Sequence, residues 1–233
     1  VMADANGSFI LLMLTMYGIS MPFMGWLVSR IPAQKIEERK MTAGQWIIAF
    51  LMCYGLMYAG NLIGTALTFG IGMVKGTGVD NPLVSTVMQL NPWVTFIIAV
   101  LIAPTAEELL FRKFLTERIV KYGELAAVLA SGLFFGLFHG NLNQFSYAFL
   151  LGLFLGFIYV KTGKLRYTIG LHMAINFIGS SLATWMLRVT GYMDTMETLT
   201  KFLNTKDLTV LADLGNGIVG MFIFGSYASL ILM

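Results

Sequence analysis

The sequence predicts an all-α membrane protein, a polytopic bundle of about seven or eight transmembrane helices. Of its 233 residues, 57% are hydrophobic and 12% are charged, whereas soluble domains carry about 25% charged residues. The mean hydropathy is +0.77. Because a membrane-spanning helix needs about 20 mostly apolar residues, the chain is long enough for seven or eight spans and leaves little for a soluble domain. We therefore expect residues 1–233 to form a single integral membrane domain.

Seven apolar segments divide the chain. They cover residues 7–28, 44–74, 92–110, 126–138, 145–160, 167–187 and 217–233. The second segment is longer than one perpendicular crossing requires and contains several glycines, so we expect it to tilt, kink or split, and a split would supply an eighth helix. The first segment is long enough to span and is followed by a basic loop, which indicates a transmembrane helix rather than a cleavable signal peptide.

Most of the basic residues lie in short clusters in the loops that follow the first, third and fifth segments. The clusters are Arg30, Lys35, Arg39 and Lys40; Arg112, Lys113, Arg118 and Lys121; and Lys161, Lys164 and Arg166. By the positive-inside rule these loops are cytoplasmic and the N-terminus lies outside. The net charge of +3 is not gathered on a face or strip of the kind that binds nucleic acid, so no nucleic-acid partner is expected.

Small residues one helical turn apart predict close contact between helix backbones. Such pairs are Gly60 with Gly64, Gly132 with Gly136, and Gly152 with Gly156. The single cysteine, Cys53, lies in an apolar stretch, so it has no partner for an internal disulfide and is expected to be a packing residue.

Three groups of polar residues interrupt the apolar segments. They are Glu107, Glu108 and Arg112 around the end of the third segment, His139 after the fourth, and His172 with Asn176 in the sixth. A charged residue at the centre of a bilayer costs on the order of 2.5 to 3.5 kcal/mol on insertion scales, so such residues usually face a cavity and have a partner or a function. The two histidines are the only ones in the chain.

The spacing within the first group separates the roles of its two glutamates. Glu108 and Arg112 are four residues apart with the acid first, which is the order favoured for an ion pair on a helix. Glu107 is rotated by about 100° from Glu108 on a helix of 3.6 residues per turn, so its carboxylate can point into the protein. The alternative is that both glutamates only mark the cytoplasmic end of this helix.

The histidines carry comparable alternatives. His172 and Asn176 are four residues apart and project from one helix face, where they can serve one oxygen atom together or simply hydrogen-bond to a neighbouring helix. His139 follows Phe135 by one turn, and taken alone it is typical of a histidine bonded within the core. The coincidence of all three polar groups on neighbouring helices instead favours a shared polar catalytic cavity.

These residues resemble the motifs of the CAAX-protease and bacteriocin-processing family of membrane proteins, also called the Abi or type II CAAX endopeptidase family. The family's Glu-Glu-x-x-x-Arg, Phe-x-x-x-His and His-x-x-x-Asn motifs correspond in order to residues 107–112, 135–139 and 172–176. The resemblance covers about residues 90–180, the core of the family. It implies a helical bundle around a polar cavity and a glutamate-dependent intramembrane endopeptidase acting on a peptide or membrane-protein substrate.

Four of these residues supply what peptide hydrolysis needs. We expect Glu107, assisted by His139, to position and deprotonate a water molecule, a contribution typically worth about 10²- to 10⁴-fold in rate. His172 and Asn176 are expected to hydrogen-bond the oxyanion, where one lost donor costs about 2.7 to 4 kcal/mol. The residues expected to support the structure of the site are Glu108, Arg112 and Phe135.

Other chemistries and functions fit part of the pattern. Glu107, His139 and His172 form a two-histidine, one-carboxylate set of the kind that binds zinc. However, the HExxH spacing is absent and the family is described as needing no metal, so no cofactor is expected. A non-proteolytic membrane immunity or regulatory protein could bind a partner through the same fold. A transporter is disfavoured because no inverted repeat accompanies the single polar cluster.

The short chain is more similar to the bacterial branch of the family than to its eukaryotic relatives, which process prenylated CAAX proteins. Bacteria generally lack such prenylated targets, so the resemblance implies a precursor peptide or membrane protein as substrate. We therefore expect an integral protein of a bacterial cell membrane, in contact with the lipid bilayer.

Overall fold

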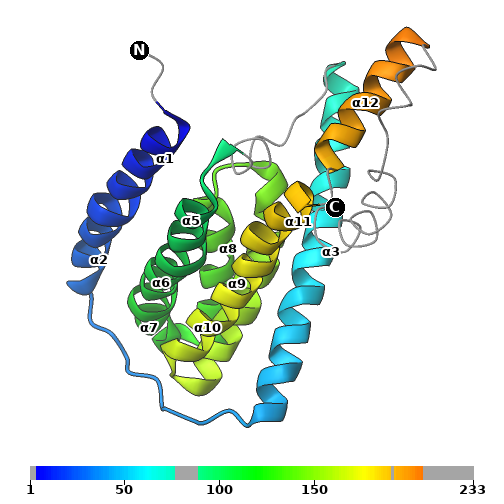
Figure 1. Ribbon diagram of the computed structural model, residues 1–233. Coiled ribbons are helices and arrows are strands. Elements are labelled where there is room, and N and C mark those ends of the chain that lie inside the picture. The colour runs from blue at the N-terminus through cyan, green and yellow to red at the C-terminus, as the bar shows by residue number, and fades with distance from the viewer. Residues whose placement is uncertain (1–3, 77–88, 190–191, 207–233) are drawn as a thin grey trace.

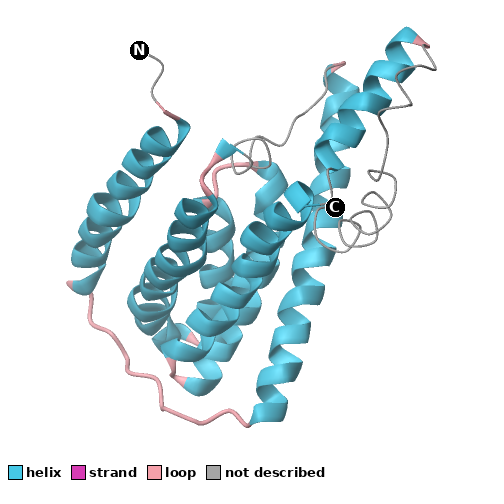
Figure 2. Ribbon diagram, in the orientation of Figure 1, coloured by secondary structure: helices cyan, strands magenta, loops and turns pink. Residues whose placement is uncertain are grey.

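The computed structural model describes residues 4–76, 89–189 and 192–206 (Figure 1). Within these ranges every regular element is a helix and there is no strand (Figure 2). This confirms the prediction of an all-α fold. The last expected span, residues 217–233, lies outside the described residues.

Two long helices stand at the flanks of the bundle in Figure 1. The first, Ala5–Ser29, is continuous, with π-helical turns at Leu14–Ser20 joining α1 (Ala5–Met13) to α2 (Met21–Ser29). The second, α3 (Ala43–Lys75), runs through 33 residues without interruption, so a split, one of the three alternatives for this segment, does not occur. At about 1.5 Å per residue it measures about 50 Å, well beyond the roughly 30 Å of a hydrocarbon core.

The remaining described helices all follow α3 along the chain. The third long helix, Pro92–Tyr122, consists of α5 (Pro92–Thr95), α6 (Ala103–Glu108) and α7 (Glu117–Ile119) with π-helical turns at Phe96–Ile102 and Leu109–Thr116 and a 3-10 turn at Val120–Tyr122. It is followed by α8 (Glu124–Phe138), α9 (Leu142–Thr162), α10 (Leu165–Asn176), π-helical turns at Phe177–Leu182, α11 (Ala183–Val189) and α12 (Tyr192–Thr205). Hydropathy does not predict α12, because this helix is amphipathic rather than uniformly apolar.

Four of the described helices are long and apolar enough to cross a membrane. They are Ala5–Ser29, Ala43–Lys75, Pro92–Tyr122 and Leu142–Thr162. The apolar helix α8 has only 15 residues, and the more polar stretch formed by α10 and α11 is not among the four. The expected count of seven or eight spans is therefore not confirmed for the described residues.

Glycines allow α3, α8 and α9 to pack backbone against backbone, as their one-turn spacing predicts. A Cβ atom added at Gly60 of α3 would lie 2.3 Å from the Cα of Tyr147 in α9, and one at Gly132 of α8 would lie 2.6 Å from the Leu153 side chain of α9. Buried apolar side chains fill the space among α3, α9 and α10, and Cys53, fully buried, is one of them. The contact among α3, α9 and α10 forms the main core of the bundle.

Replacement of Gly60 by alanine is expected to destabilise the bundle by about 1 to 3 kcal/mol, because the added methyl group collides with backbone and α3 must move away from α9. Gly55→Ala is the matched control on the same helix, since a Cβ there meets no atom within 4 Å. We expect it to be neutral or stabilising by up to about 1 kcal/mol through helix propensity. Thermal unfolding of the two variants in detergent measures the difference, and equal melting temperatures would contradict the close packing.

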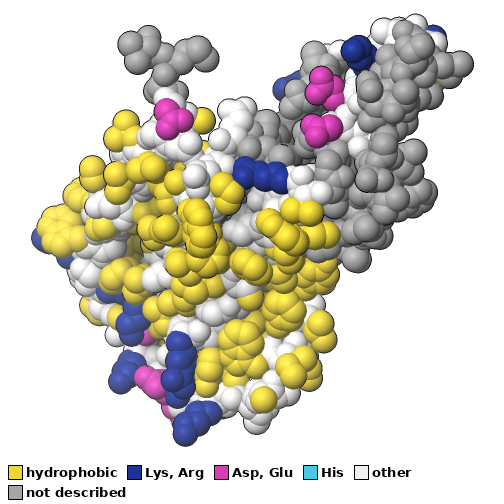
Figure 3. All heavy atoms as spheres, viewed as in Figure 1, with side chains coloured by type: hydrophobic (Ala, Val, Ile, Leu, Met, Phe, Trp, Pro, Cys, Tyr) yellow, Lys and Arg dark blue, Asp and Glu magenta, His cyan; other side chains and the backbone are white. Residues whose placement is uncertain are grey.

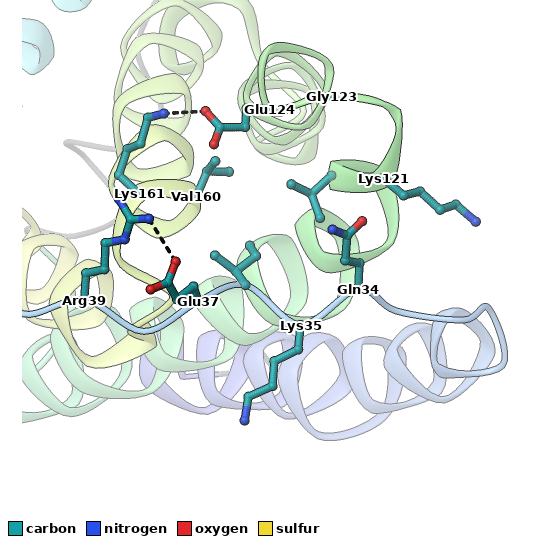
Figure 4. A pocket seen from close by; sticks show the side chains of 11 residues that line it. Gln34, Lys35, Glu37, Arg39, Lys121, Gly123, Glu124, Val160 and Lys161 are labelled. Atoms are coloured by element: carbon teal, nitrogen blue, oxygen red, sulfur yellow. Dashed lines mark hydrogen bonds and ion pairs between the residues drawn. The ribbon is translucent and has the colours of Figure 1, made fainter.

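Of the basic cluster predicted for the loop after the third segment, Arg112, Lys113 and Arg118 instead lie within the third helix, and Arg112 is fully buried. The loops after the first and fifth segments and the end of the third helix meet at one end of the bundle. They surround a pocket of about 480 Å³ (Figure 4), across which Lys161 pairs with Glu124 while Arg39 pairs with Glu37 at its edge. In Figure 3, Lys and Arg side chains gather at this lower end and hydrophobic side chains cover the middle of the visible face. The first helix begins at the opposite end (Figure 1). The visible face thus has an apolar middle and a basic lower end, a charge distribution typical of membrane proteins.

Candidate active site

Glu107 and Glu108 lie at the centre of the third helix. Glu107 is 15 residues from each end of Pro92–Tyr122, and α6, which carries both glutamates, has π-helical turns on either side. Pro104 in α6 has no N–H to donate and its ring crowds the preceding turn, which explains the widened helix before the glutamates. The two carboxylates are almost inaccessible, since Glu107 is 5% exposed and Glu108 is fully buried.

Glu108 is held by the ion pair with Arg112 that the four-residue spacing predicts. The pair is bidentate: Arg112 Nε lies 2.7 Å from Glu108 Oε2, and Nη2 lies 3.1 Å from Oε1. Arg112 Nη1 donates to the Ser131 hydroxyl on α8, and the guanidinium lies 5.1 Å from the centre of the Phe135 ring. Because both charges are fully buried, these bonds are what makes their burial tolerable.

His172 lies between the two glutamates. Its Nδ1 is 3.0 Å from Glu108 Oε1, and its Nε2 is 3.7 Å from Glu107 Oε2. An ionised carboxylate only accepts hydrogen bonds, so Nδ1 carries the proton of this bond and Nε2 is directed at Glu107. Glu108 therefore orients the imidazole against Glu107, in addition to pairing with arginine.

The second oxygen of Glu107 accepts a hydrogen bond that none of the sequence motifs predicts. The Tyr17 hydroxyl donates to Glu107 Oε1 at 2.6 Å, although the two residues are 90 positions apart. Tyr17 lies at the centre of the first helix, 12 residues from each end of Ala5–Ser29. Since tyrosines of membrane helices concentrate at the interfaces, a tyrosine at mid-helix was the available signal that this side chain has a polar partner.

His139 and Asn176 lie around this cluster with partners of their own. His139 follows the last residue of α8, and its Nδ1 is 2.9 Å from the carbonyl oxygen of Phe135. The Phe135 ring contacts both imidazoles, with its centre 5.1 Å from that of His139 and 5.4 Å from that of His172. Asn176 Nδ2 donates to the carbonyl oxygen of Ala99 at 2.9 Å, which ties α10 to the third helix and leaves its second N–H for another acceptor.

The three polar motifs therefore meet in one region of the bundle. Glu107, Glu108 and His172 are in direct mutual reach, while Phe135 connects His139 to them. In the part of the chain that the structure describes, no three His, Cys, Asp or Glu side chains are grouped so that they could hold a metal ion. This includes the zinc set of Glu107, His139 and His172 considered from the sequence.

A carboxylate oxygen of Glu107 and an imidazole nitrogen of His172 face each other at 3.7 Å. At 3.7 Å, Glu107 Oε2 and His172 Nε2 are too far apart for a direct hydrogen bond, so each retains capacity for a third polar atom lying beside both. When a carboxylate and an imidazole both contact one polar atom, they can transfer protons to and from it in general acid–base catalysis. Glu108, itself paired with Arg112, bonds His172 Nδ1 and so fixes the imidazole.

Residues 89–178 match the family model of type II CAAX prenyl endopeptidase Rce1-like proteins. This segment is an Rce1-like domain. The match confirms the family that the three motifs indicate, although it spans less than half of the chain. No curated protein and no solved structure matches the chain. Together with the apolar helices, the family supports an integral membrane protein that is a peptidase.

The Rce1-like domain contains the third helix and α8 to α10, and therefore all three polar motifs. The first helix and α3 lie outside it. The Glu108–Arg112–His172 network is thus built entirely within the Rce1-like domain. Tyr17, in contrast, reaches the domain from a part of the chain that the family model does not cover.

Proposed function

We propose that the chain is an intramembrane glutamate-type endopeptidase that hydrolyses a peptide bond of a membrane-associated peptide or protein. The observation that carries the proposal is the placement of Glu107 opposite His172 Nε2, with Nδ1 of the same imidazole held by Glu108. Glu107 is nearly buried at the centre of an apolar helix. A carboxylate in that position, with a histidine at 3.7 Å, is better explained by proton transfer than by helix packing.

In the proposed reaction a water molecule lies beside Glu107 and His172. Glu107 accepts one proton of the water while the water oxygen bonds to the carbonyl carbon of the substrate, and the carbonyl π electrons move to its oxygen. Collapse of this tetrahedral intermediate breaks the C–N bond. The proton on Glu107 then passes to the leaving nitrogen, which regenerates the carboxylate and releases a carboxylic acid and an amine.

The other motif residues take supporting roles in this proposal. His139 assists Glu107 from the end of α8, next to Phe135. His172 Nε2, when it also carries a proton, and the second N–H of Asn176 donate hydrogen bonds to the oxyanion. Glu108, Arg112 and Phe135 hold these groups in register. All steps use side chains of the chain itself, and no cofactor is invoked.

The substrate in this proposal is a precursor peptide or a membrane protein, without a required prenyl group, in a bacterial cell membrane. A site at the centre of a membrane helix is reached most directly by a segment that already lies at the bilayer. The basic end faces the cytoplasm, and the first helix begins outside, because positively charged loops are retained on the cytoplasmic side.

Comparing cells that carry the intact chain with cells that carry Glu107→Gln tests the proposal and searches for the substrate. Peptides in the medium and truncated membrane proteins are quantified by mass spectrometry. We expect cleavage products that appear with the intact chain and with the control Glu197→Gln, an exposed glutamate of α12, but disappear with Glu107→Gln. Identical products from all three strains would overturn the peptidase proposal in favour of a non-proteolytic immunity or regulatory role.

A further inference from the structure

The hydroxyl of Tyr17 is a hydrogen-bond donor that contacts the proposed base directly. It donates to Glu107 Oε1 at 2.6 Å, a short distance that is typical of a hydroxyl bonded to a carboxylate. The other oxygen, Oε2, faces His172. The two oxygens of Glu107 are thus shared between a donor from the first helix and an imidazole from α10.

Two other side chains of the site each use one nitrogen in a structural bond. His172 Nδ1 is bonded to Glu108, and one N–H of Asn176 is bonded to the Ala99 carbonyl. The Tyr17 hydroxyl differs because its acceptor is the carboxylate that must receive the proton of the water. When water and substrate enter, this O–H can pass from Glu107 to a new acceptor, because other contacts also join the first helix to the third.

Contacts elsewhere along the first helix hold Tyr17 in place. At one end, the Asn6 side chain accepts a hydrogen bond from the backbone N–H of Asn91. Toward the other end, Gly25 lies so close to Phe114 that an added Cβ would be 3.1 Å from its ring, and Arg118 donates to the carbonyl of Val28. Because the helix is attached on both sides of Tyr17, we expect the ring to keep its place when the hydroxyl is removed.

We propose that Tyr17 is a catalytic residue whose hydroxyl donates a hydrogen bond to the oxyanion. The inference rests on the proposed function and adds to it a donor from outside the Rce1-like domain. As the water oxygen attacks the carbonyl carbon and Glu107 takes the water proton, the electron pair of the C=O bond moves to the carbonyl oxygen. Tyr17 stabilises that negative oxygen and keeps its own proton throughout.

The test compares Tyr17→Phe with Tyr159→Phe in purified protein reconstituted in lipid, using a substrate found by the comparison of cells above. Tyr159 is the matched control, because its hydroxyl also donates to a glutamate, Glu117 Oε1 at 2.9 Å, at the basic end. We expect Tyr17→Phe to lower kcat by about 10²- to 10³-fold, the effect of one missing oxyanion donor. KM should stay within about twofold, and Tyr159→Phe should keep the kcat of the intact protein.

Two further variants, Tyr17→His and Glu107→Gln, distinguish a failure of the role of Tyr17 from a failure of the proposed function. Tyr17→His retains a donor at this position and should recover part of the kcat lost in Tyr17→Phe, which a purely structural role would not produce. A kcat of Tyr17→Phe equal to or above that of the intact protein, while Glu107→Gln is inactive, would overturn the role of Tyr17 and leave the proposed function standing. Full activity of Glu107→Gln would instead overturn the proposed function.

Discussion

Glu107→Gln is expected to lower kcat for peptide hydrolysis by about 10²- to 10⁴-fold, since an amide cannot accept the proton of the attacking water. The substitution preserves the size of the side chain, and the amide oxygen can still accept the hydrogen bond from Tyr17. The protein should therefore fold normally and bind its substrate with little change in KM. Initial rates in lipid vesicles, together with thermal unfolding of the same preparation, measure the two effects separately.

Glu117→Gln is the matched control for this prediction. Glu117 is 6% exposed, lies on the same helix as Glu107 and also accepts a hydrogen bond from a tyrosine, Tyr159. Its ion pair with Lys113 lies near the basic end. We expect Glu117→Gln to retain kcat within about threefold, and a loss in both variants alike would show that any buried glutamate of this helix is needed for folding rather than for chemistry.

Arg112→Met is expected to destabilise the protein by about 3 to 5 kcal/mol, because it leaves the Glu108 carboxylate buried without its counter-charge. The Ser131 hydroxyl also loses its partner, and His172 loses part of its support, since Glu108 orients it. Loss of activity should accompany loss of the fold. Chemical or thermal denaturation in detergent, followed by circular dichroism, measures the change.

Two further variants isolate the contribution of the buried ion pair. Arg39→Met removes an exposed ion pair with Glu37 and should cost less than about 1 kcal/mol. The double variant of Arg112→Met with Glu108→Met removes both buried charges and should regain part of the stability lost in Arg112→Met alone. If Arg112→Met unfolds at the temperature of the intact protein, the buried pair is not what holds the third helix to α8 and α10.

The sequence predicted the elements of this protein that depend on local spacing. Long apolar runs predicted helices wherever the structure describes them, and the four-residue spacing predicted the bidentate pair of Glu108 and Arg112. Glycines one turn apart predicted the contact at Gly60. These features follow from helix periodicity, because residues three or four positions apart share a face whatever the rest of the chain does.

Hydropathy was a weaker guide to the number of spans and to amphipathic structure. The long second segment forms one helix, α3, and the amphipathic helix α12 went unpredicted. Apolar composition indicates where a helix can lie in lipid, but the length and continuity of each helix depend on its capping and on its neighbours. Thr42 and Gln45 form a capping box that fixes the start of α3, and no hydropathy pattern encodes it.

The family motifs indicated which residues gather at the site, and the tertiary structure alone decided how they pair. His172 reaches Glu108 over 64 positions, Asn176 reaches Ala99 over 77, and Tyr17 reaches Glu107 over 90. Such pairs depend on the rotation and register of one helix against another, which side-chain packing sets across the whole bundle. Local periodicity therefore determined which residues share a helix face. Helix packing determined that Glu107 lies between the imidazole of His172 and the phenol of Tyr17.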